Sequence, residues 1–392
     1  MSEAKILIVD DEPFNVDYLI QELEDLDYLT LSASNGQQAL EMVATSSPDL
    51  VLLDIMMPVM DGFEVLSQMK ANPHTQNIPV IIVSAMSDLL SVVKGIEQGA
   101  EDFLPKPFEP AILKARISAC LERKRLRDLE QHYLKAMERE LEIGREIQQS
   151  FLPSELPQLA GWEIAKYFKS AREVAGDFYD AFRLPDGNLL CVIGDVCDKG
   201  VGAALFMTLF RSLIRFTATS YYDHLLNSEI GPSTSELLKQ IVSLTNDYIA
   251  QTHSDSSMFA TIFICVINPS HNTLTYINCG HEPPYWSHVS QTITVLKNTG
   301  PLVGLIPDAQ FNTDEIFLED GDLVFLYTDG VPDALNMDNV FFGKECLLAI
   351  LQSGKPHPAE LLDHISEQLT NFIGQAFPFD DITMLAIQRQ SA

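Results

Sequence analysis

The sequence predicts two folded domains of different class, an α/β domain with a doubly wound, five-stranded parallel sheet and then an α+β domain, joined by a long helix. The chain has 392 residues, which is too long for a single hydrophobic core. Residues 5–120 alternate apolar runs with helical stretches five times, whereas strands and helices are clustered after Gly161. We therefore expect a first domain over residues 1–122, a helical linker over 123–150 and a second domain over 151–392.

Polar side chains follow the apolar runs of the first domain. Asp10 and Asp11 follow the first run, and Asp54, Ser84 and Lys106 each follow a later one. Continuous apolar runs indicate strands that are buried on both faces, as in parallel sheets. The carboxyl ends of neighbouring parallel strands converge in one crevice. We expect the carboxylates there to bind Mg²⁺, while the lysine and the hydroxyl hold the oxygens of a phosphoryl group.

The segment over residues 109–149 is predicted to form one long helix. It is rich in Glu, Arg, Leu and Gln, and no proline occurs between Pro110 and Pro153. Glu140 interrupts an apolar stripe whose members are spaced mainly by three or four residues: Leu126, Leu129, Tyr133, Ala136, Ile143 and Ile147. Two interpretations stay open, a parallel coiled coil in a homodimer and a single helix that packs on its own domain.

The second domain begins with strand-like runs, and helical stretches and further strands follow. This clustering predicts a β-sandwich of two sheets flanked by helices. The strand-like runs cover residues 162–168, 178–184, 189–194, 258–267, 273–279, 322–328 and 382–388, and the helical stretches cover 201–222, 234–251 and 357–373.

Four aspartates of the second domain lie at the ends of apolar, strand-like runs: Asp177, Asp195, Asp329 and Asp380. Carboxylates that are gathered at strand ends repel one another unless a cation lies between them. Ligand sets made of oxygen alone select hard ions, Mg²⁺ or Mn²⁺. Two such ions can bind a phosphoryl group and activate a water. The competing interpretation is that these residues serve in turns, where Asp-Gly is common.

Composition argues against several classes of partner and location. The formal net charge of −30, from 25 basic and 55 acidic residues, argues against nucleic acid or an anionic membrane as the main partner. The six cysteines form no C-x-x-C pair and are expected to be reduced thiols. The N-terminus shows no signal-like stretch, and the apolar run 258–267 is about half of what a bilayer requires. We expect a cytoplasmic protein without membrane contact.

Residues 1–120 resemble a bacterial response-regulator receiver domain. The matching residues are V-D-D at 9–11, L-L-D-I-M-M-P-V-M-D-G at 52–62, V-S-A at 83–85 and F-L-P-K-P-F at 103–108. The resemblance implies that a sensor histidine kinase or a phosphotransfer protein phosphorylates Asp54. It also implies that one Mg²⁺ is bound by Asp10, Asp11, Asp54 and the Met56 carbonyl, that Ser84 and Lys106 contact the phosphoryl oxygens, and that Phe103 is the switch aromatic.

Residues from about 145 to 392 resemble the metal-dependent PPM protein phosphatases, specifically the SpoIIE-like serine phosphatases. The matching motifs are E-V-A-G-D-F-Y-D at 173–180, G-D-V-C-D-K-G-V-G-A-A-L-F-M at 194–207, N-C-G-H-E-P-P at 278–284, L-Y-T-D-G-V at 326–331 and D-D-I-T at 380–383. The resemblance implies two or more Mg²⁺ or Mn²⁺ ions. Their ligands would be the catalytic residues Asp177, Asp195, Asp329 and Asp380 and the Val196 carbonyl.

Two positions depart from the family pattern. Ala175 stands where Gly is usual, which costs little unless the residue needs a positive φ. Cys197-Asp198 replaces the usual Ser-Gly, and so places a thiol and a further carboxylate beside the predicted metal ligands. This pair could alter metal affinity or make activity sensitive to oxidation.

Four further residues near these motifs have two interpretations each. Asp381 is expected to support Asp380 rather than to bind metal itself. His281 either holds the turn that follows it or touches metal or phosphate. Lys199 and Arg172 are candidates for binding the substrate phosphate, and each is equally explained as an exposed basic side chain.

Together these features predict a two-component response regulator whose output is dephosphorylation of a phosphoserine or phosphothreonine protein, controlled by Asp54. The resemblance implies a phosphorylated anti-sigma-factor antagonist as substrate. Three alternatives stay open. The first is a pseudophosphatase that binds a phosphoprotein without hydrolysing it. The second is a DNA-binding regulator, against which the net charge of −30 counts. The third is a nucleotide second-messenger enzyme, for which no P-loop or guanine-binding motif is found.

Overall fold

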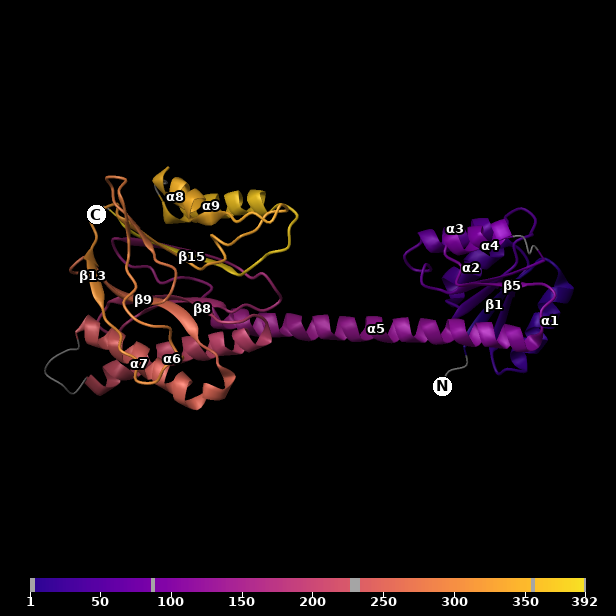
Figure 1. Ribbon diagram of the computed structural model, residues 1–392, viewed down its shortest axis with the longest axis horizontal. Coiled ribbons are helices and arrows are strands. Elements are labelled where there is room, and N and C mark those ends of the chain that lie inside the picture. Colours follow the sequence, from indigo (N-terminus) through magenta and orange to yellow (C-terminus); the bar gives the residue numbers. More distant parts are fainter. Residues whose placement is uncertain (1–3, 86–88, 226–232, 354–356, 391–392) are drawn as a thin grey trace. The chain divides into compact units, whose positions relative to one another are not determined.

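The structure is a computed structural model, and it describes residues 4–85, 89–225, 233–353 and 357–390. It divides into two compact units, Met1–Glu138 and Arg139–Ala392, and each is described by itself (Figure 1). The boundary falls inside helix α5 (Pro110–Phe151), so that the predicted linker contributes residues to both units.

The first unit is an α/β domain with a five-stranded parallel sheet in the order β2-β1-β3-β4-β5. The strand order reverses between β1 and β3, as in a doubly wound sheet, and the predicted fold class is confirmed. The elements are β1 (Lys5–Val9), α1 (Pro13–Glu24), β2 (Leu29–Ala33), α2 (Gly36–Ser46), β3 (Leu50–Leu53), α3 (Gly62–Ala71), β4 (Val80–Ser84), α4 (Leu89–Glu97) and β5 (Asp102–Pro105).

Helices cover both faces of this sheet because its central strands bury both faces. Ile6 and Ile8 of β1 share a core with α1 and the start of α5, whereas Leu7 and Val9 share a core with α2 and α3 (Figure 1). Such a strand needs a continuous apolar run rather than an alternating one. The polar residues that follow each strand are therefore confined to the carboxyl edge of the sheet.

Helix α5 is a single helix of 42 residues, as the sequence predicts. Its first turns are held by Leu113, Ile117 and Cys120, which are fully buried in the core of the first unit. Most of the large apolar side chains between residues 126 and 147 are exposed, Leu126, Leu129, Tyr133, Leu134, Met137, Ile143 and Ile147. Most of these apolar side chains are therefore not buried against other described residues. Pairing of two copies of the chain through them stays a prediction.

The second unit contains two antiparallel five-stranded sheets, in the orders β13-β10-β9-β8-β7 and β12-β11-β14-β15-β6. The strands are β6 (Trp162–Lys169), β7 (Asp177–Arg183), β8 (Leu189–Val196), β9 (Ala260–Asn268), β10 (Thr273–Cys279), β11 (Tyr285–Ser287), β12 (Ile293–Val295), β13 (Asp314–Phe317), β14 (Leu323–Tyr327) and β15 (Ile382–Arg389). The helices are α6 (Val201–Leu225), α7 (Thr234–Thr252), α8 (Gly343–Gln352) and α9 (Pro358–Ile373), with a short 3-10 turn at Ser254–Ser256.

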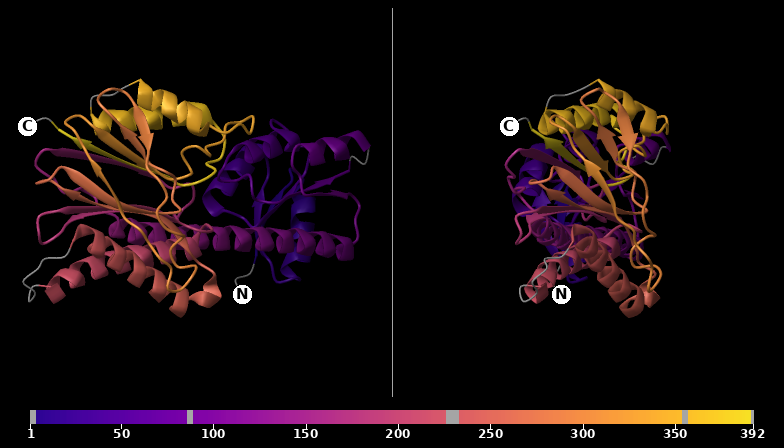
Figure 2. Two further views of the ribbon diagram at one scale, coloured as in Figure 1. Left: turned by 60° about the vertical axis from the view of Figure 1, so that its left-hand side comes forward. Right: turned by 90° about the vertical axis from the view of Figure 1, so that its left-hand side faces the viewer.

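The sheets pack face to face, and a pair of helices covers each outer face (Figure 2). Strand β14 shows why: Val324 and Leu326 lie in the core between the sheets, whereas Phe325 and Tyr327 lie in the core beneath α8 and α9. The β-sandwich flanked by helices is confirmed. Because α6 and α7 pack on one sheet and α8 and α9 on the other, the two ends of the sandwich remain available for loops.

Four elements of the second unit were not predicted: β11, β12, β13 and α8. Strands β12 and β13 have three and four residues, and most of these residues are exposed, so they show no alternation of apolar and polar positions. Helix α8 begins at Gly343, whose φ of +80° favours glycine. No helix or strand was predicted for the apolar residues of this stretch.

One described helix is long and apolar enough to cross a membrane, judged by length and composition alone. It is the segment Val201–Tyr222 of α6, of which 39% is buried inside the domain. The buried residues Met207, Phe210, Ile214 and Ala218 recur every three or four positions and belong to the core of the second unit. That periodicity is typical of a core helix in a folded domain.

Candidate active site and phosphoacceptor site

The first unit brings three predicted metal ligands together at the carboxyl edge of its sheet. Asp10 and Asp11 follow β1 and Asp54 follows β3, and one oxygen from each carboxylate lies within 4.8 Å of the others. Asp10 and Asp54 are buried, whereas Asp11 is exposed. Three oxygen ligands with one open side suit a Mg²⁺ ion that keeps several waters.

Lys106 extends into the same pocket from the end of β5. Its Nζ lies 2.6 Å from Asp10 Oδ2 and 3.1 Å from Asp54 Oδ1. Burial raises the pKa of Asp54, and the charge of Lys106 partly offsets that rise. Burial alone would lower the pKa of Lys106, but its bond to Asp10 and the charge of Asp54 raise it. The ammonium is therefore held beside the predicted phosphoacceptor in its charged form.

The remaining predicted residues of this unit lie around the pocket. The Met56 N–H donates to Asp54 Oδ2 over 3.1 Å, which places the Met56 peptide beside the acid. Ser84, at the end of β4, is fully buried, and its carbonyl accepts from the Lys106 N–H. Phe103 of β5 lies in the core with α2 and α3, so that the predicted switch aromatic adopts an inward position.

The second unit gathers its predicted acids at one end of the sandwich. Asp177 begins β7 and lies opposite Asp195 of β8 in the same antiparallel ladder. Asp329 follows β14 and Asp380 precedes β15, and these two strands pair in the other sheet. Each sheet therefore supplies two of the four acids.

Two threonine hydroxyls connect the sheets at this end. Both donate to Asp177 Oδ2, from Thr328 Oγ1 over 2.8 Å and from Thr383 Oγ1 over 2.5 Å. Thr328 and Thr383 are fully buried. These contacts were not predicted from the sequence, although Thr328 directly precedes Asp329 and Thr383 lies three positions after Asp380. Their bonds fix one oxygen of Asp177 and leave the other for a ligand.

The acids of the second unit raise one another's pKa values. Burial, and then the charges of Asp329 and Asp380, raises the pKa of Asp195 to about 8. Burial and the charge of Asp380 raise the pKa of Asp329 to about 6. Burial and the charge of Asp195 raise the pKa of Asp177. A set of buried and half-buried oxygen donors that repel one another is suited to hard divalent cations, and so the residues fit Mg²⁺ or Mn²⁺.

These four acids are more widely spaced than the acids of the first unit. Among the described residues, only the Asp10, Asp11 and Asp54 group brings three ligand atoms within 4.8 Å of one another. Asp380 is instead paired with Lys199, whose Nζ lies 2.7 Å from Asp380 Oδ2 and donates to the Phe379 carbonyl. Lys199 therefore contacts a predicted metal ligand in this structure.

Asp381 holds the loop that precedes Asp177. Its carboxylate accepts from the Ala171 N–H over 2.7 Å and from the Gly176 N–H over 2.8 Å. Gly176 is closely surrounded, because a Cβ there would lie 3.0 Å from the Val196 carbonyl oxygen. The Asp381 side chain thus supports the loop before Asp177, whereas we expected it to support Asp380.

The departures from the family pattern have physical explanations here. Asp198 has a φ of +72°, a conformation that favours glycine, the usual residue there, and that Asp tolerates better than most residues. Ala175 is not among the residues with positive φ, so alanine is accommodated. The Cys197 thiol accepts from the Phe259 N–H, and burial raises the pKa of this thiol, which disfavours a reactive thiolate.

His281 and Arg172 differ in their surroundings. His281 is buried, its Nδ1 lies 2.9 Å from Thr261 Oγ1, and burial lowers the pKa of its ring to about 4. Its backbone N–H donates to the side chain of Asn278, three positions earlier in the chain. Arg172 is exposed.

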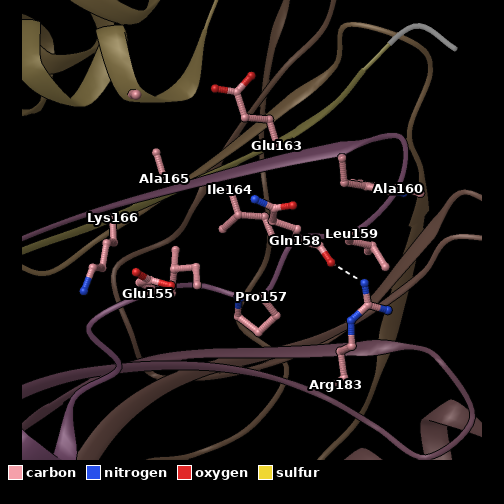
Figure 3. A pocket seen from close by; sticks show the side chains of 13 residues that line it. Glu155, Pro157, Gln158, Leu159, Ala160, Glu163, Ile164, Ala165, Lys166 and Arg183 are labelled. Carbon is pink, nitrogen blue, oxygen red and sulfur yellow. Dashed lines mark hydrogen bonds between the residues drawn. The ribbon is translucent and has the colours of Figure 1, made fainter.

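A cavity of about 860 Å³ lies elsewhere in the second unit (Figure 3). It is bordered by residues 155–160 and by the edge strand β6, and Arg183 donates to the Gln158 carbonyl at its side. None of the predicted metal ligands lines it. The carboxylate cluster is therefore distinguished by its chemistry and not by the size of a cavity.

The raised pKa of Asp195 predicts how metal-free protein responds to pH. The folded carboxyl, with a pKa of about 8, keeps a proton that the unfolded chain releases near the ordinary value of 3.8. Stability of the metal-free fold should therefore fall as the pH rises from about 4 to about 8. Asp195→Asn should flatten this dependence, measured as the unfolding temperature in chelator across the range. The exposed Asp255→Asn is the control, and an unchanged slope in Asp195→Asn would contradict the assignment.

Comparisons with known proteins find relatives of both units. The response regulator receiver domain family matches residues 6–118. Protein IcfG from Synechocystis sp. is 45% identical over 262 residues, which are 64% of this chain and 41% of that protein. The phosphoserine phosphatase RsbU from Bacillus subtilis is 28% identical over 254 residues, 64% of this chain and 70% of RsbU. The chain spans less than half the length of the first curated relatives that it matches.

Solved structures show the same fold. The SiaA-PP2C domain of Pseudomonas aeruginosa aligns with a TM-score of 0.54 and 21% identity, over 65% of this chain and 98% of that one. The family of Stage II sporulation protein E (SpoIIE) matches residues 185–390, which is more than half of the 392 residues. The chain therefore belongs to the SpoIIE family, with a response-regulator receiver domain followed by a protein serine/threonine phosphatase domain of the PPM type.

Proposed function

We propose that this chain is a response regulator whose output is metal-dependent dephosphorylation of a phosphoserine or phosphothreonine protein, controlled by phosphorylation of Asp54. The observation that carries the proposal is the set of mutually repelling acids at one end of the sandwich, Asp177, Asp195, Asp329 and Asp380. A folded domain tolerates such a set when cations neutralise it.

The chain's own residues have defined tasks in this proposal. Mg²⁺ or Mn²⁺ held by the four acids and the Val196 carbonyl would supply positive charge for the phosphoryl oxygens and lower the pKa of an attacking water. Thr328 and Thr383 keep Asp177 oriented, and Asp381 holds the loop before it. The proposal needs no phosphocysteine, because the attacking group is a water, and the raised pKa of the Cys197 thiol is in keeping with this.

The substrate is proposed to be a phosphoprotein. The relative RsbU bears the description phosphoserine phosphatase. By resemblance, the substrate of this chain is a phosphorylated anti-sigma-factor antagonist. A pseudophosphatase is the second candidate, favoured by the pairing of Asp380 with Lys199 over 2.7 Å. Hydrolysis by the wild type decides between the two.

The first unit is proposed to receive the signal. Asp54 lies beside Lys106 and within a group of acids that can hold Mg²⁺, which is what phosphotransfer from a histidine kinase or a phosphotransfer protein requires. The added negative charge would bias the surroundings of Ser84 and Phe103 and so the start of α5. The exposed apolar stripe of α5 is proposed to pair two copies of the chain in a homodimer.

Hydrolysis of p-nitrophenyl phosphate and of a phosphoserine protein with Mn²⁺ tests the catalytic proposal. Asp329→Asn should lower turnover by about a hundredfold or more, because it removes a proposed ligand of the cations that stabilise negative charge in the transition state. The fold should persist, since neutralising Asp329 relieves repulsion. The exposed Asp338→Asn is the control. Turnover near the wild-type value in Asp329→Asn at saturating Mn²⁺ would refute the metal-site assignment, and absence of turnover in the wild type would favour the pseudophosphatase.

Labelling with a small phosphodonor tests the phosphoacceptor. The wild type should take up phosphate that alkali and hydroxylamine release, as expected of an acyl phosphate, in the presence of Mg²⁺, and Asp54→Asn should take up none. Asp17→Asn, an exposed acid on α1, should behave as the wild type does. Equal labelling of Asp54→Asn and the wild type would show that another residue is the acceptor.

Replacement of residues 126–138 with a Gly/Ser linker tests whether α5 carries the signal. Beryllium fluoride, which mimics the phosphoryl group, should raise wild-type turnover by about fivefold or more. The linker variant should keep basal turnover and lose the stimulation, because a flexible linker does not transmit rotation. A control in which alanine replaces only polar residues of 126–138 keeps both the helix and the apolar stripe, and should keep the stimulation. Equal stimulation in all three proteins would favour direct contact between the domains.

A further inference from the structure

The side chain of Gln148, near the end of α5, hydrogen-bonds both backbone polar groups of Ala175. Gln148 Nε2 donates to the Ala175 carbonyl over 2.7 Å, and Gln148 Oε1 accepts from the Ala175 N–H over 2.9 Å. Gln148 is 7% exposed and Ala175 is fully buried. The pair therefore lies away from competing water, where a hydrogen bond is directional and its loss is costly.

The bonded residue lies two positions before Asp177, a predicted metal ligand. Residues 170–176 form neither helix nor strand, so no ladder of backbone bonds fixes their course. The loop is held from two sides instead, by Gln148 at Ala175 and by the Asp381 carboxylate at Gly176. The loop that leads into Asp177 is thus held by two side chains that are remote in sequence, in addition to the β7–β8 ladder and the threonine bonds at Asp177 itself.

A second contact lies one helical turn earlier on the same face of α5. A Cβ at Gly144 would lie 3.8 Å from Val174 Cγ1, at ordinary contact distance, so the helix surface there adjoins the loop. Residues four apart share a helix face, so that Gly144 and Gln148 present one surface to residues 174–175. A movement of this end of α5 must therefore either carry the loop with it or break the two hydrogen bonds.

We propose that Gln148 is a positioning residue for the metal centre, through which the end of α5 determines where Asp177 lies. The inference rests on the proposed function and adds to it the side chain by which the linker helix acts. An amide is required because it donates and accepts at once. Glutamate keeps the shape but cannot donate when ionised, and methionine keeps the length without either bond.

Mn²⁺ binding by titration calorimetry tests the proposal without relying on turnover. Full-length protein carrying Asp11→Asn, which removes an acid from the first unit's pocket, is the background for every variant. Gln148→Glu and Gln148→Met should weaken Mn²⁺ binding by about tenfold or more, as expected when a residue supporting a metal ligand is lost. Gln149→Glu and Gln149→Met change the exposed neighbour on the same turn and should bind as the background does.

Two further results separate positioning from simple packing. In an Asp177→Asn protein, Gln148→Met should cause no additional loss of Mn²⁺ affinity, because its effect passes through Asp177. A purely structural residue would lower the unfolding temperature and leave Mn²⁺ affinity unchanged. Background-like affinity in both Gln148→Glu and Gln148→Met would overturn the inference. Absence of Mn²⁺ binding in the background protein itself would overturn the proposed function instead.

Discussion

Repulsion between buried and half-buried carboxylates is the constraint on which the second unit depends. Asp177 and Asp195 face each other across one ladder, and the charges of Asp329 and Asp380 raise the pKa of Asp195 to about 8. No folded domain gains stability from such an arrangement in the absence of cations. The surrounding polar contacts are best understood as the means of keeping the acids together until cations bind.

Those contacts come from three separate parts of the chain. The hydroxyls of Thr328 and Thr383 reach Asp177 from the opposite sheet, Asp381 holds the preceding loop, and Gln148 holds the same loop from α5. Each partner acts on the position of Asp177 or of its loop rather than on bound substrate. The Gln148 amide thus connects helix α5 to the loop before Asp177 through hydrogen bonds to the backbone of Ala175.

Much of the architecture was predictable because strands that are buried on both faces appear in the sequence as continuous apolar runs. The continuous apolar runs of β1, β3 and β4 indicated a parallel sheet, and topology then implied that Asp10, Asp54 and Lys106 converge. Strands β12 and β13 were not predicted because they are short and most of their residues are exposed. The contact of Gln148 was not predicted for another reason. A glutamine in a long polar helix does not stand out in the pattern of apolar residues, and its partner Ala175 lies 27 residues away.

The bond between Thr383 and Asp177 joins residues 206 positions apart. The acids of the second unit therefore enter the chain in an order that ends with Asp380, close to the final strand β15. A chain that is cut before Asp380 carries Asp177, Asp195 and Asp329 but lacks both the last acid and one of the two hydroxyls that orient the first. Such a segment cannot assemble the full set of acids that is proposed to bind the cations, so loss of this short stretch would disable the site even though three of its acids remain.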